Sequence, residues 1–110
     1  MLHRALLING QWYDGIGPRF SKTNPATNEL LWESNEAHAS DVNRAVAAAR
    51  DAFPAWAKTP LDSRIALLQR FAQLLEVQKP ELAAVIAKET GKPRWEALTE
   101  VQTMVNKVAI

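Results

Sequence analysis

Apolar and polar residues alternate in short runs over the first third of the chain, the pattern of half-buried β-strands. Asn9 and Gly10 separate the first two runs, and this pair favours a two-residue hairpin because both residues tolerate positive φ. Asn24 followed by Pro25 predicts a turn before the last run. The four expected strands lie within residues 5–8, 11–14, 19–25 and 29–34.

From Ser40 onward the period of the apolar positions changes from two to about 3.6, which predicts helices over residues 40–110. Ser40 is expected to cap the first helix, and Pro54 should end or bend it. Thr59 and the proline after it are a typical cap and first helical residue for the second helix. This division gives a strand and hairpin region over 1–37, followed by four helices.

Prolines also predict where the third and fourth helices start. Pro80 begins the third, which should end near Thr90 with Gly91 as a left-handed stop, and Pro93 begins the fourth. The apolar stripe of the fourth helix consists of Trp95, Leu98, Val101, Val105 and Val108. No usual helix terminator follows this stripe before Ile110. We therefore expect these 110 residues to be part of a longer polypeptide.

Composition and charge exclude several classes of function. The chain has 110 residues, of which 47% are apolar and 23% are charged. These values are ordinary for a globular protein, and the length amounts to one domain or less. Thirteen basic and twelve acidic residues give a net charge of +1, so we expect no nucleic-acid partner. No run approaches the ~18–20 apolar residues of a membrane span, so we expect a cytoplasmic, soluble protein without a membrane partner.

Gly91 and Lys92 resemble the end of a phosphate-binding loop, but the pattern around them differs. A P-loop has a glycine five residues before the Gly-Lys pair and a hydroxyl residue after it. Ile86 and Pro93 occupy these positions, so the pair predicts a corner between helices. The chain also has no cysteine, which excludes disulfides, thiolate metal sites and a cysteine nucleophile from it.

Two other patterns have the residue types of a chemical site but lack its remaining members. Gly15 and Gly17 lack the third glycine of a dinucleotide-binding loop, because Phe20 stands in its place, so they predict a turn. Glu96 and Glu100 lie four residues apart on the fourth helix, a spacing that can hold a metal, but no third ligand accompanies them at helical spacing. A solvated or partner-facing pair is the simpler interpretation, with Lys107 partly neutralising it.

Four motifs then occur in a fixed order. They are Asn9-Gly10 with Trp12, the Asn24-Pro25 turn, the helix end "AFPAW" at 52–56, and "ETGKP" at 89–93 followed by Glu96-Ala97. Together they resemble the amino-terminal segment of the NAD(P)-dependent aldehyde dehydrogenase superfamily over essentially the whole chain. The closing stretch, 89–110, is most similar to members that oxidise N-succinylglutamate 5-semialdehyde to N-succinylglutamate in bacterial arginine breakdown.

This resemblance implies a parent α/β fold with a Rossmann-like coenzyme domain, on which the helices of residues 40–110 would pack. It also implies NAD or NADP as cofactor, a small aldehyde as substrate and a homo-oligomer. The catalytic cysteine of the family attacks the aldehyde, and a glutamate activates the water that releases the acid. These residues and the cofactor's Gly-rich turn lie further along the family's chain. We therefore assign no catalytic or cofactor-binding residue here and expect the segment alone to be inactive, with the rest of the same polypeptide as its partner.

The resemblance assigns two further sites residue by residue. Glu100 and Met104 match positions that border the substrate tunnel, although relatives often have an apolar residue at the first of them, and Lys107 could face a dicarboxylate substrate. Some relatives also hold a monovalent cation with backbone carbonyls and a carboxylate. The matching residues are Lys22, Thr23 and Glu89. A different interpretation stays open: a stand-alone helical interaction module without catalysis, for which the last helix should be complete and capped.

Overall fold

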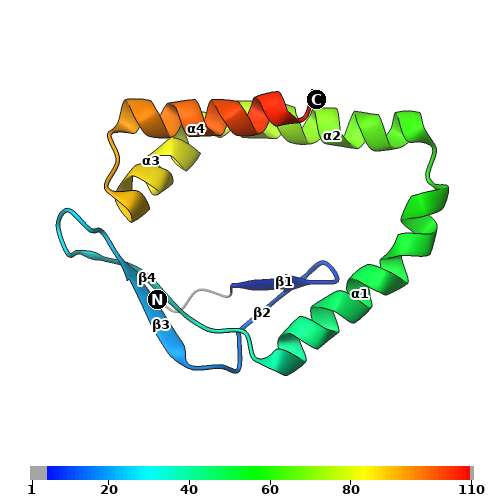
Figure 1. Ribbon diagram of the computed structural model, residues 1–110, viewed down its shortest axis with the longest axis horizontal. Helices are drawn as coiled ribbons and strands as arrows, with labels where there is room; N and C mark the ends of the chain where they lie inside the picture. The colour runs from blue at the N-terminus through cyan, green and yellow to red at the C-terminus, as the bar shows by residue number, and fades with distance from the viewer. Residues whose placement is uncertain (1–4, 110) are drawn as a thin grey trace. The chain divides into compact units, whose positions relative to one another are not determined.

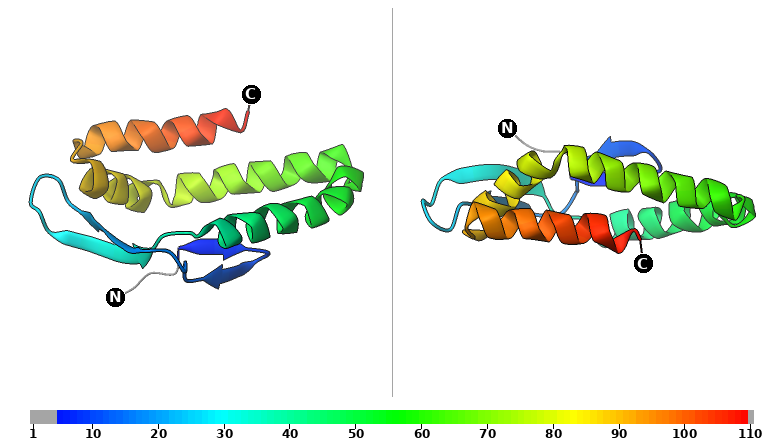
Figure 2. Two further views of the ribbon diagram at one scale, coloured as in Figure 1. Left: turned by 60° about the horizontal axis from the view of Figure 1, so that its bottom comes forward. Right: turned by 90° about the horizontal axis from the view of Figure 1, so that it is seen from above.

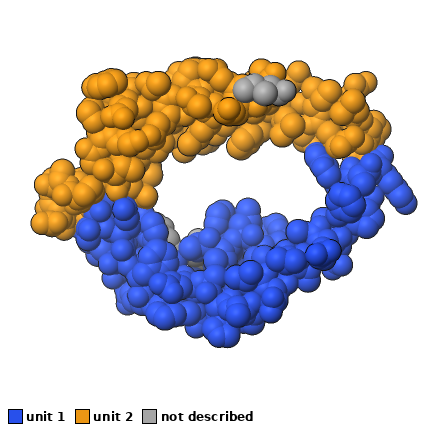
Figure 3. Space-filling model, viewed as in Figure 1, with its two compact units in different colours: residues 1–23, 30–58 blue, residues 24–29, 59–110 orange. Residues whose placement is uncertain are grey.

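The computed structural model describes residues 5–109, and the chain divides into two compact units (Figure 1; Figure 3). Unit 1 comprises residues 1–23 and 30–58, and unit 2 comprises residues 24–29 and 59–110. The elements in chain order are β1 (Leu6–Ile8), β2 (Gln11–Tyr13), β3 (Arg19–Thr23), β4 (Leu30–Asn35), α1 (Ala39–Lys58), α2 (Leu61–Val77), α3 (Lys79–Thr90) and α4 (Arg94–Lys107). Four strands and four helices among these residues confirm the predicted series.

In unit 1 the first two strands form the predicted hairpin. β1 and β2 pair antiparallel, with Ile8 opposite Gln11, so that two residues form the turn. Those residues, Asn9 and Gly10, have φ of 51° and 75°. Positive φ at both positions matches the twist of the flanking strands, which explains why the Asn-Gly pair predicted this turn.

The second strand pair of unit 1 is held by side chains across the ladder. β3 and β4 pair antiparallel, and the register shifts between Lys22 and Thr23. The rings of Phe20 and Trp32 meet edge to face with centroids 5.3 Å apart. The guanidinium of Arg19 donates to the carboxylate of Glu33 on the opposite strand. Aromatic and oppositely charged pairs across strands each contribute about 0.2–1 kcal/mol, so this hairpin has several small sources of stability.

The loop between β2 and β3 lies directly against the end of β4. The N–H of Gly17 donates to the carbonyl of Glu36 at 2.9 Å. A Cβ atom on Gly15 would lie 2.2 Å from the same carbonyl oxygen. Gly15 is therefore required because the two backbones approach closely, and this pair of glycines forms a turn rather than a loop around a dinucleotide.

The start of α1 corrects the predicted cap. α1 begins at Ala39, so Ser40 lies inside the helix, and the carbonyl of His38 accepts the N–H groups of Asp41 and Val42. His38 is thus the N-cap residue, and its Nδ1 accepts the N–H of Ser40 at 3.3 Å. The Asp41 carboxylate in turn accepts the N–H of His38 at 2.9 Å. This reciprocal arrangement is a capping box in which histidine and aspartate replace the usual residues.

Asp41 is also the centre of a polar cluster in unit 1. Its side chain is buried, accepts the N–H of Ile16 at 3.5 Å and pairs with Arg44 at 3.3 Å. The Arg44 guanidinium lies over the ring of Tyr13, 4.3 Å from its centroid. The hydrogen bond from the His38 backbone lowers the pKa of Asp41 most, burial opposes it, and the Ile16 N–H and the Arg44 charge lower the pKa further. The cluster joins the β2–β3 loop to the start of α1.

Pro54 was expected to end or bend the first helix, and the first of these was wrong, because Pro54 lies inside α1, which continues to Lys58. A proline lacks only its own N–H, and the residues after it can still complete helical turns. In unit 2, Pro60 and Pro93 are the N-cap residues of α2 and α4 rather than their first helical residues, and neither helix start has a side-chain cap. The predicted boundaries were one residue early at both helices.

The core of unit 2 lies between α3 and α4. Ala83, Ala97 and Val101 are completely buried, and four partly buried residues pack around them: Leu82, Ile86, Ala87 and Leu98. Alanine on both helices lets the two backbones approach closely. α4 also runs back beside α2 in both views of Figure 2. Within the predicted α4 stripe, Trp95 is 71% exposed and is not part of this core.

Several helices keep apolar faces outside these cores. α2 buries none of its residues, and Leu61, Leu68 and Phe71 are each more than half exposed. On α1, Val42 and Phe53 are likewise exposed at 53% and 64%. α4 ends at Lys107 in a turn, and Ile110 lies outside the described residues. Over residues 5–109 no helix combines the length and the apolar character that a bilayer crossing requires.

Candidate functional site

The corner between α3 and α4 has the geometry that its sequence predicted. Gly91 has φ of 76°, and its N–H donates to the carbonyl of Ala87 at 2.9 Å, which closes α3. Pro93 then fixes the start of α4 with φ of −58°. The N–H of Gly91 is used by the helix end, so this pair does not form a phosphate loop. A left-handed glycine followed by proline is a chain reversal between two helices.

Lys92 makes a contact that the sequence analysis did not predict. Its ammonium donates to the carboxylate of Glu100, eight residues further along the chain. The two side chains are 31% and 40% exposed. The hydrogen bond to Glu100 raises the pKa of Lys92 most, partial burial opposes the shift, and the charges of Glu100 and Glu96 add to it. Lys92 is therefore charged at neutral pH.

This ion pair corrects the predicted environment of Glu100, whereas Glu96 is exposed as expected. We expected Glu96 and Glu100 to be solvated or partner-facing, with Lys107 as the neutralising cation. Instead, Lys92 is the hydrogen-bonded partner of Glu100. Spacing rules for helix faces relate residues three, four or seven apart on one helix. They miss this pair because Lys92 precedes the helix and reaches along it from the corner.

The three residues assigned to a substrate tunnel lie on one face of α4. Glu100, Met104 and Lys107 are spaced by four and three residues, which places them in one row along the helix. Met104 is 45% exposed, and Lys107 is exposed. Ala97 and Val101, which pack against α3, lie directly beside this row, since Ala97 is three residues before Glu100. α4 therefore has packed residues that anchor it and, next to them, a more open face with two charged groups and a thioether.

The residues assigned to a monovalent cation are divided between the units. Lys22 and Thr23 lie on β3 in unit 1, and Glu89 lies on α3 in unit 2. The register shift between Lys22 and Thr23 interrupts the ladder, which releases backbone groups there for other contacts. This is compatible with carbonyl ligands, but the site stays a prediction. Among residues 5–109, no three histidine, aspartate or glutamate side chains form a metal cluster.

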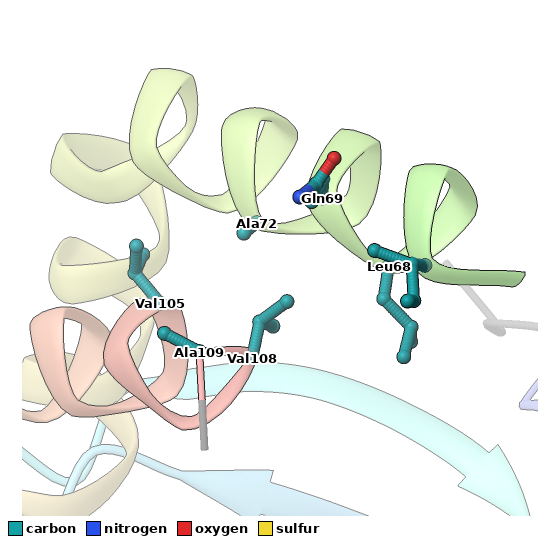
Figure 4. A pocket seen from close by; sticks show the side chains of 7 residues that line it. Leu68, Gln69, Ala72, Val105, Val108 and Ala109 are labelled. Carbon is teal, nitrogen blue, oxygen red and sulfur yellow. The ribbon is translucent and has the colours of Figure 1, made fainter. Parts of the chain in front are cut away.

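A shallow apolar hollow of about 460 Å³ lies in unit 2 between α2 and the end of α4. Figure 4 shows Leu68 and Ala72 on one side of it, and Val105 and Val108 on the other. Gln69 is the polar side chain in its lining, which otherwise also includes Ile65 and Ala109. A hollow with this lining can bury apolar side chains and offers no acid, base or nucleophile for a reaction.

Comparison with known sequences relates this geometry to a family. The sequence profile of the aldehyde dehydrogenase family matches residues 12–110. The chain belongs to this family. It is 59% identical over all 110 residues to N-succinylglutamate 5-semialdehyde dehydrogenase of Serratia proteamaculans (strain 568), and 56% identical over 106 residues to the enzyme of the same name from Salmonella heidelberg (strain SL476).

Solved structures agree with this family and with the expected fold class. A NAD-dependent benzaldehyde dehydrogenase from Corynebacterium glutamicum matches 93% of the chain with a TM-score of 0.90 and 35% identity. A NADP-dependent glyceraldehyde-3-phosphate dehydrogenase from Bacillus halodurans, complexed with NADP, matches 91% with a TM-score of 0.86 and 33% identity. The short strand pairs and four helices are thus those of the amino-terminal part of the aldehyde dehydrogenase α/β fold.

The match covers a limited part of each relative. The chain spans 22% of the length of both curated enzymes, although it is matched over 100% and 96% of its own length. It likewise covers 22% and 21% of the two solved structures. The activity of a whole aldehyde dehydrogenase therefore depends on far more chain than these residues provide.

Proposed function

We propose that this chain is the amino-terminal part of an NAD(P)-dependent aldehyde dehydrogenase that oxidises N-succinylglutamate 5-semialdehyde to N-succinylglutamate. The observation that carries this proposal is the 59% identity, over the entire chain, to a curated enzyme named for that substrate. In the balanced reaction, the aldehyde, water and NAD(P)⁺ give the carboxylate, NAD(P)H and two protons. The relatives described above use NAD or NADP, so the proposal extends to either cofactor.

The proposal divides the work between this chain and the rest of the polypeptide. The cofactor, when bound, accepts the hydride, and the nucleophile, the activating base and the cofactor site belong to the remainder. The chain itself has no cysteine. Its own contribution is the face of α4 with Glu100, Met104 and Lys107, which we place beside the route of the substrate. Because Ala97 and Val101 pack against α3 on the side of the helix next to this row, the three side chains have a fixed base.

The exposed apolar faces of the helices are evidence that a large part of the same polypeptide packs against them. Monomeric proteins rarely expose extended apolar patches, yet α1, α2 and the hollow of Figure 4 all present apolar side chains. We propose that the remaining polypeptide, including its coenzyme-binding domain, covers these faces. Homo-oligomer formation, a cytoplasmic location and the monovalent cation at Lys22, Thr23 and Glu89 stay predictions from the sequence.

Activity measurements on the full-length polypeptide and on residues 1–110 test the proposal. The full-length protein should form reduced cofactor with N-succinylglutamate 5-semialdehyde and NAD or NADP, followed by the absorbance of NAD(P)H. Residues 1–110 alone should give no more than the blank and should bind a hydrophobic dye through their open helix faces. If residues 1–110 are dye-silent, unfold cooperatively and occur naturally without further chain, the interaction-module interpretation replaces this one.

A further inference from the structure

The Lys92–Glu100 ion pair connects the α3–α4 corner to the second turn of α4. The backbone of Lys92 is held on both sides, by the left-handed Gly91 before it and by Pro93 after it. Its N–H also lies 3.4 Å from the hydroxyl of Thr90. The corner thus positions Lys92 so that its side chain runs along α4 and its ammonium reaches the carboxylate of Glu100.

The pair decides the charge at one end of the open face of α4. Glu100 without its partner would place a negative charge beside Met104, one turn along the same row. Lys107 is two turns from Glu100, about 10 Å of helix rise, so it cannot replace a hydrogen-bonded cation. With Lys92 in place the two charges sum to zero. The charge of this part of the face is therefore set by a residue outside the helix.

We propose that Lys92 is a positioning residue that neutralises Glu100 and thereby determines the preference of the enzyme for aldehydes that carry a carboxylate. This inference rests on the proposed function, in which the open face of α4 borders the route of the substrate. An anionic aldehyde that passes an unpaired Glu100 is repelled, because like charges in a partly desolvated site interact strongly. A neutral aldehyde lacks this interaction, so the ratio of kcat/KM for the two substrates reports the charge at Glu100.

The test is a charge series in the full-length enzyme. The readout is kcat/KM for N-succinylglutamate 5-semialdehyde divided by kcat/KM for benzaldehyde, a neutral aldehyde. Lys92→Met leaves a net negative charge, and the ratio should fall about tenfold, mainly through KM. Glu100→Gln leaves a net positive charge, and the ratio should rise. The double variant is neutral again and should return the ratio to within about twofold of the parent.

Lys88→Met is the matched control, because Lys88 is exposed in the last turn of α3, and it should keep the parental ratio. A purely structural role of Lys92 predicts equal losses for both aldehydes and no recovery in the double variant, and either result would overturn the inference. If Lys92→Met does not fold, Glu100→Gln decides alone, since an unchanged or lower ratio overturns the inference as well. A parent enzyme that oxidises neither aldehyde would instead refute the proposed function.

Discussion

The two units are stabilised by different kinds of contact. In unit 2 the fully buried side chains are apolar: Ala83, Ala97 and Val101. In unit 1 the buried side chains are those of Ile8, Ser34 and Asp41, so polar groups predominate among the described positions. The first unit is held by capping, backbone contacts and ion pairs, and the second by close packing of small side chains.

This difference also separates α1 from α4, although an apolar stripe was predicted on both helices. α4 has 14 residues and buries two apolar ones, whereas α1 has 20 residues and buries only Asp41. A hydrogen bond contributes a net ~0.5–1.5 kcal/mol, while burial of one large apolar side chain contributes ~1.5–3 kcal/mol. Unit 1 should therefore open at lower free energy than unit 2, and its stability should depend on geometry and pH more than on side-chain volume.

The largest expected effect breaks the close backbone approach in unit 1. Gly15→Ala places a Cβ 2.2 Å from the carbonyl oxygen of Glu36, a backbone atom that cannot rotate away. The β2–β3 loop must move, and we expect the free energy of opening of unit 1 to fall by about 3 kcal/mol. Native-state hydrogen exchange of the β3, β4 and α1 amides in the full-length enzyme measures this loss.

Gly10→Ala is the control for that prediction. Gly10 has positive φ but nothing within 4 Å of a Cβ. Alanine there should cost only about 1 kcal/mol, through its backbone conformation. Equal effects at the two glycines would show that backbone conformation, rather than close approach, governs unit 1. An equal loss of protection in α3 and α4 would show that the units open together, which contradicts the comparison.

The next effect weakens unit 2 through its core. Val101→Ala removes two methyl groups from a completely buried position. We expect a loss of about 2 kcal/mol in the free energy of opening of α4. Val85→Ala is the same substitution on α3 at a side chain that is 53% exposed. It should change stability by less than about 0.5 kcal/mol. Hydrogen exchange of the α3 and α4 amides compares the two, and similar losses would refute this core.

Features that depend on a single residue could be predicted from the sequence, whereas features that depend on several neighbouring residues could not. Asn9-Gly10 and Gly91 were predicted correctly, because positive φ depends on the residue itself. Ser40 was wrong as a cap because the helix starts earlier: the His38 carbonyl already accepts the N–H groups of Asp41 and Val42, and the Asp41 carboxylate accepts the N–H of His38. Local rules identify the kind of element, but its first residue depends on which neighbour captures the free N–H groups.

The candidate site divides in the same way. The shared face of Glu100, Met104 and Lys107 follows from helical spacing, so it was predictable once α4 was recognised. The pairing of Lys92 with Glu100 depends on the direction in which the side chain leaves the backbone at the corner, and spacing rules for helices do not describe this direction. The exposure of Trp95 was also unpredicted. An apolar stripe shows which face of a helix can be buried, but it does not show which residues of that face are buried within residues 5–109.

The smallest expected effect is a dependence of unit 1 on pH through Asp41. Its pKa lies below the ordinary value of 3.8, chiefly because the carboxylate accepts the His38 N–H. A lowered folded-state pKa means that Asp41 contributes stability at pH values above about 4, and that this contribution is lost as the pH falls through the folded-state pKa. Asp41→Asn should therefore weaken the first turn of α1 at neutral pH and remove this acid-dependent step.

Asp51→Asn is the matched control, because Asp51 is exposed on the same helix and does not belong to the capping box. Hydrogen exchange of the first turn of α1, measured from neutral pH to below about pH 4 and corrected for the intrinsic exchange rate, follows the step in the parent and in both variants. The step should persist in Asp51→Asn and vanish in Asp41→Asn. If the acid-dependent step persists in both variants, the acid sensitivity of unit 1 comes from another group. The Asp41 carboxylate could then be replaced by any side chain that accepts the N–H groups of His38 and Ile16.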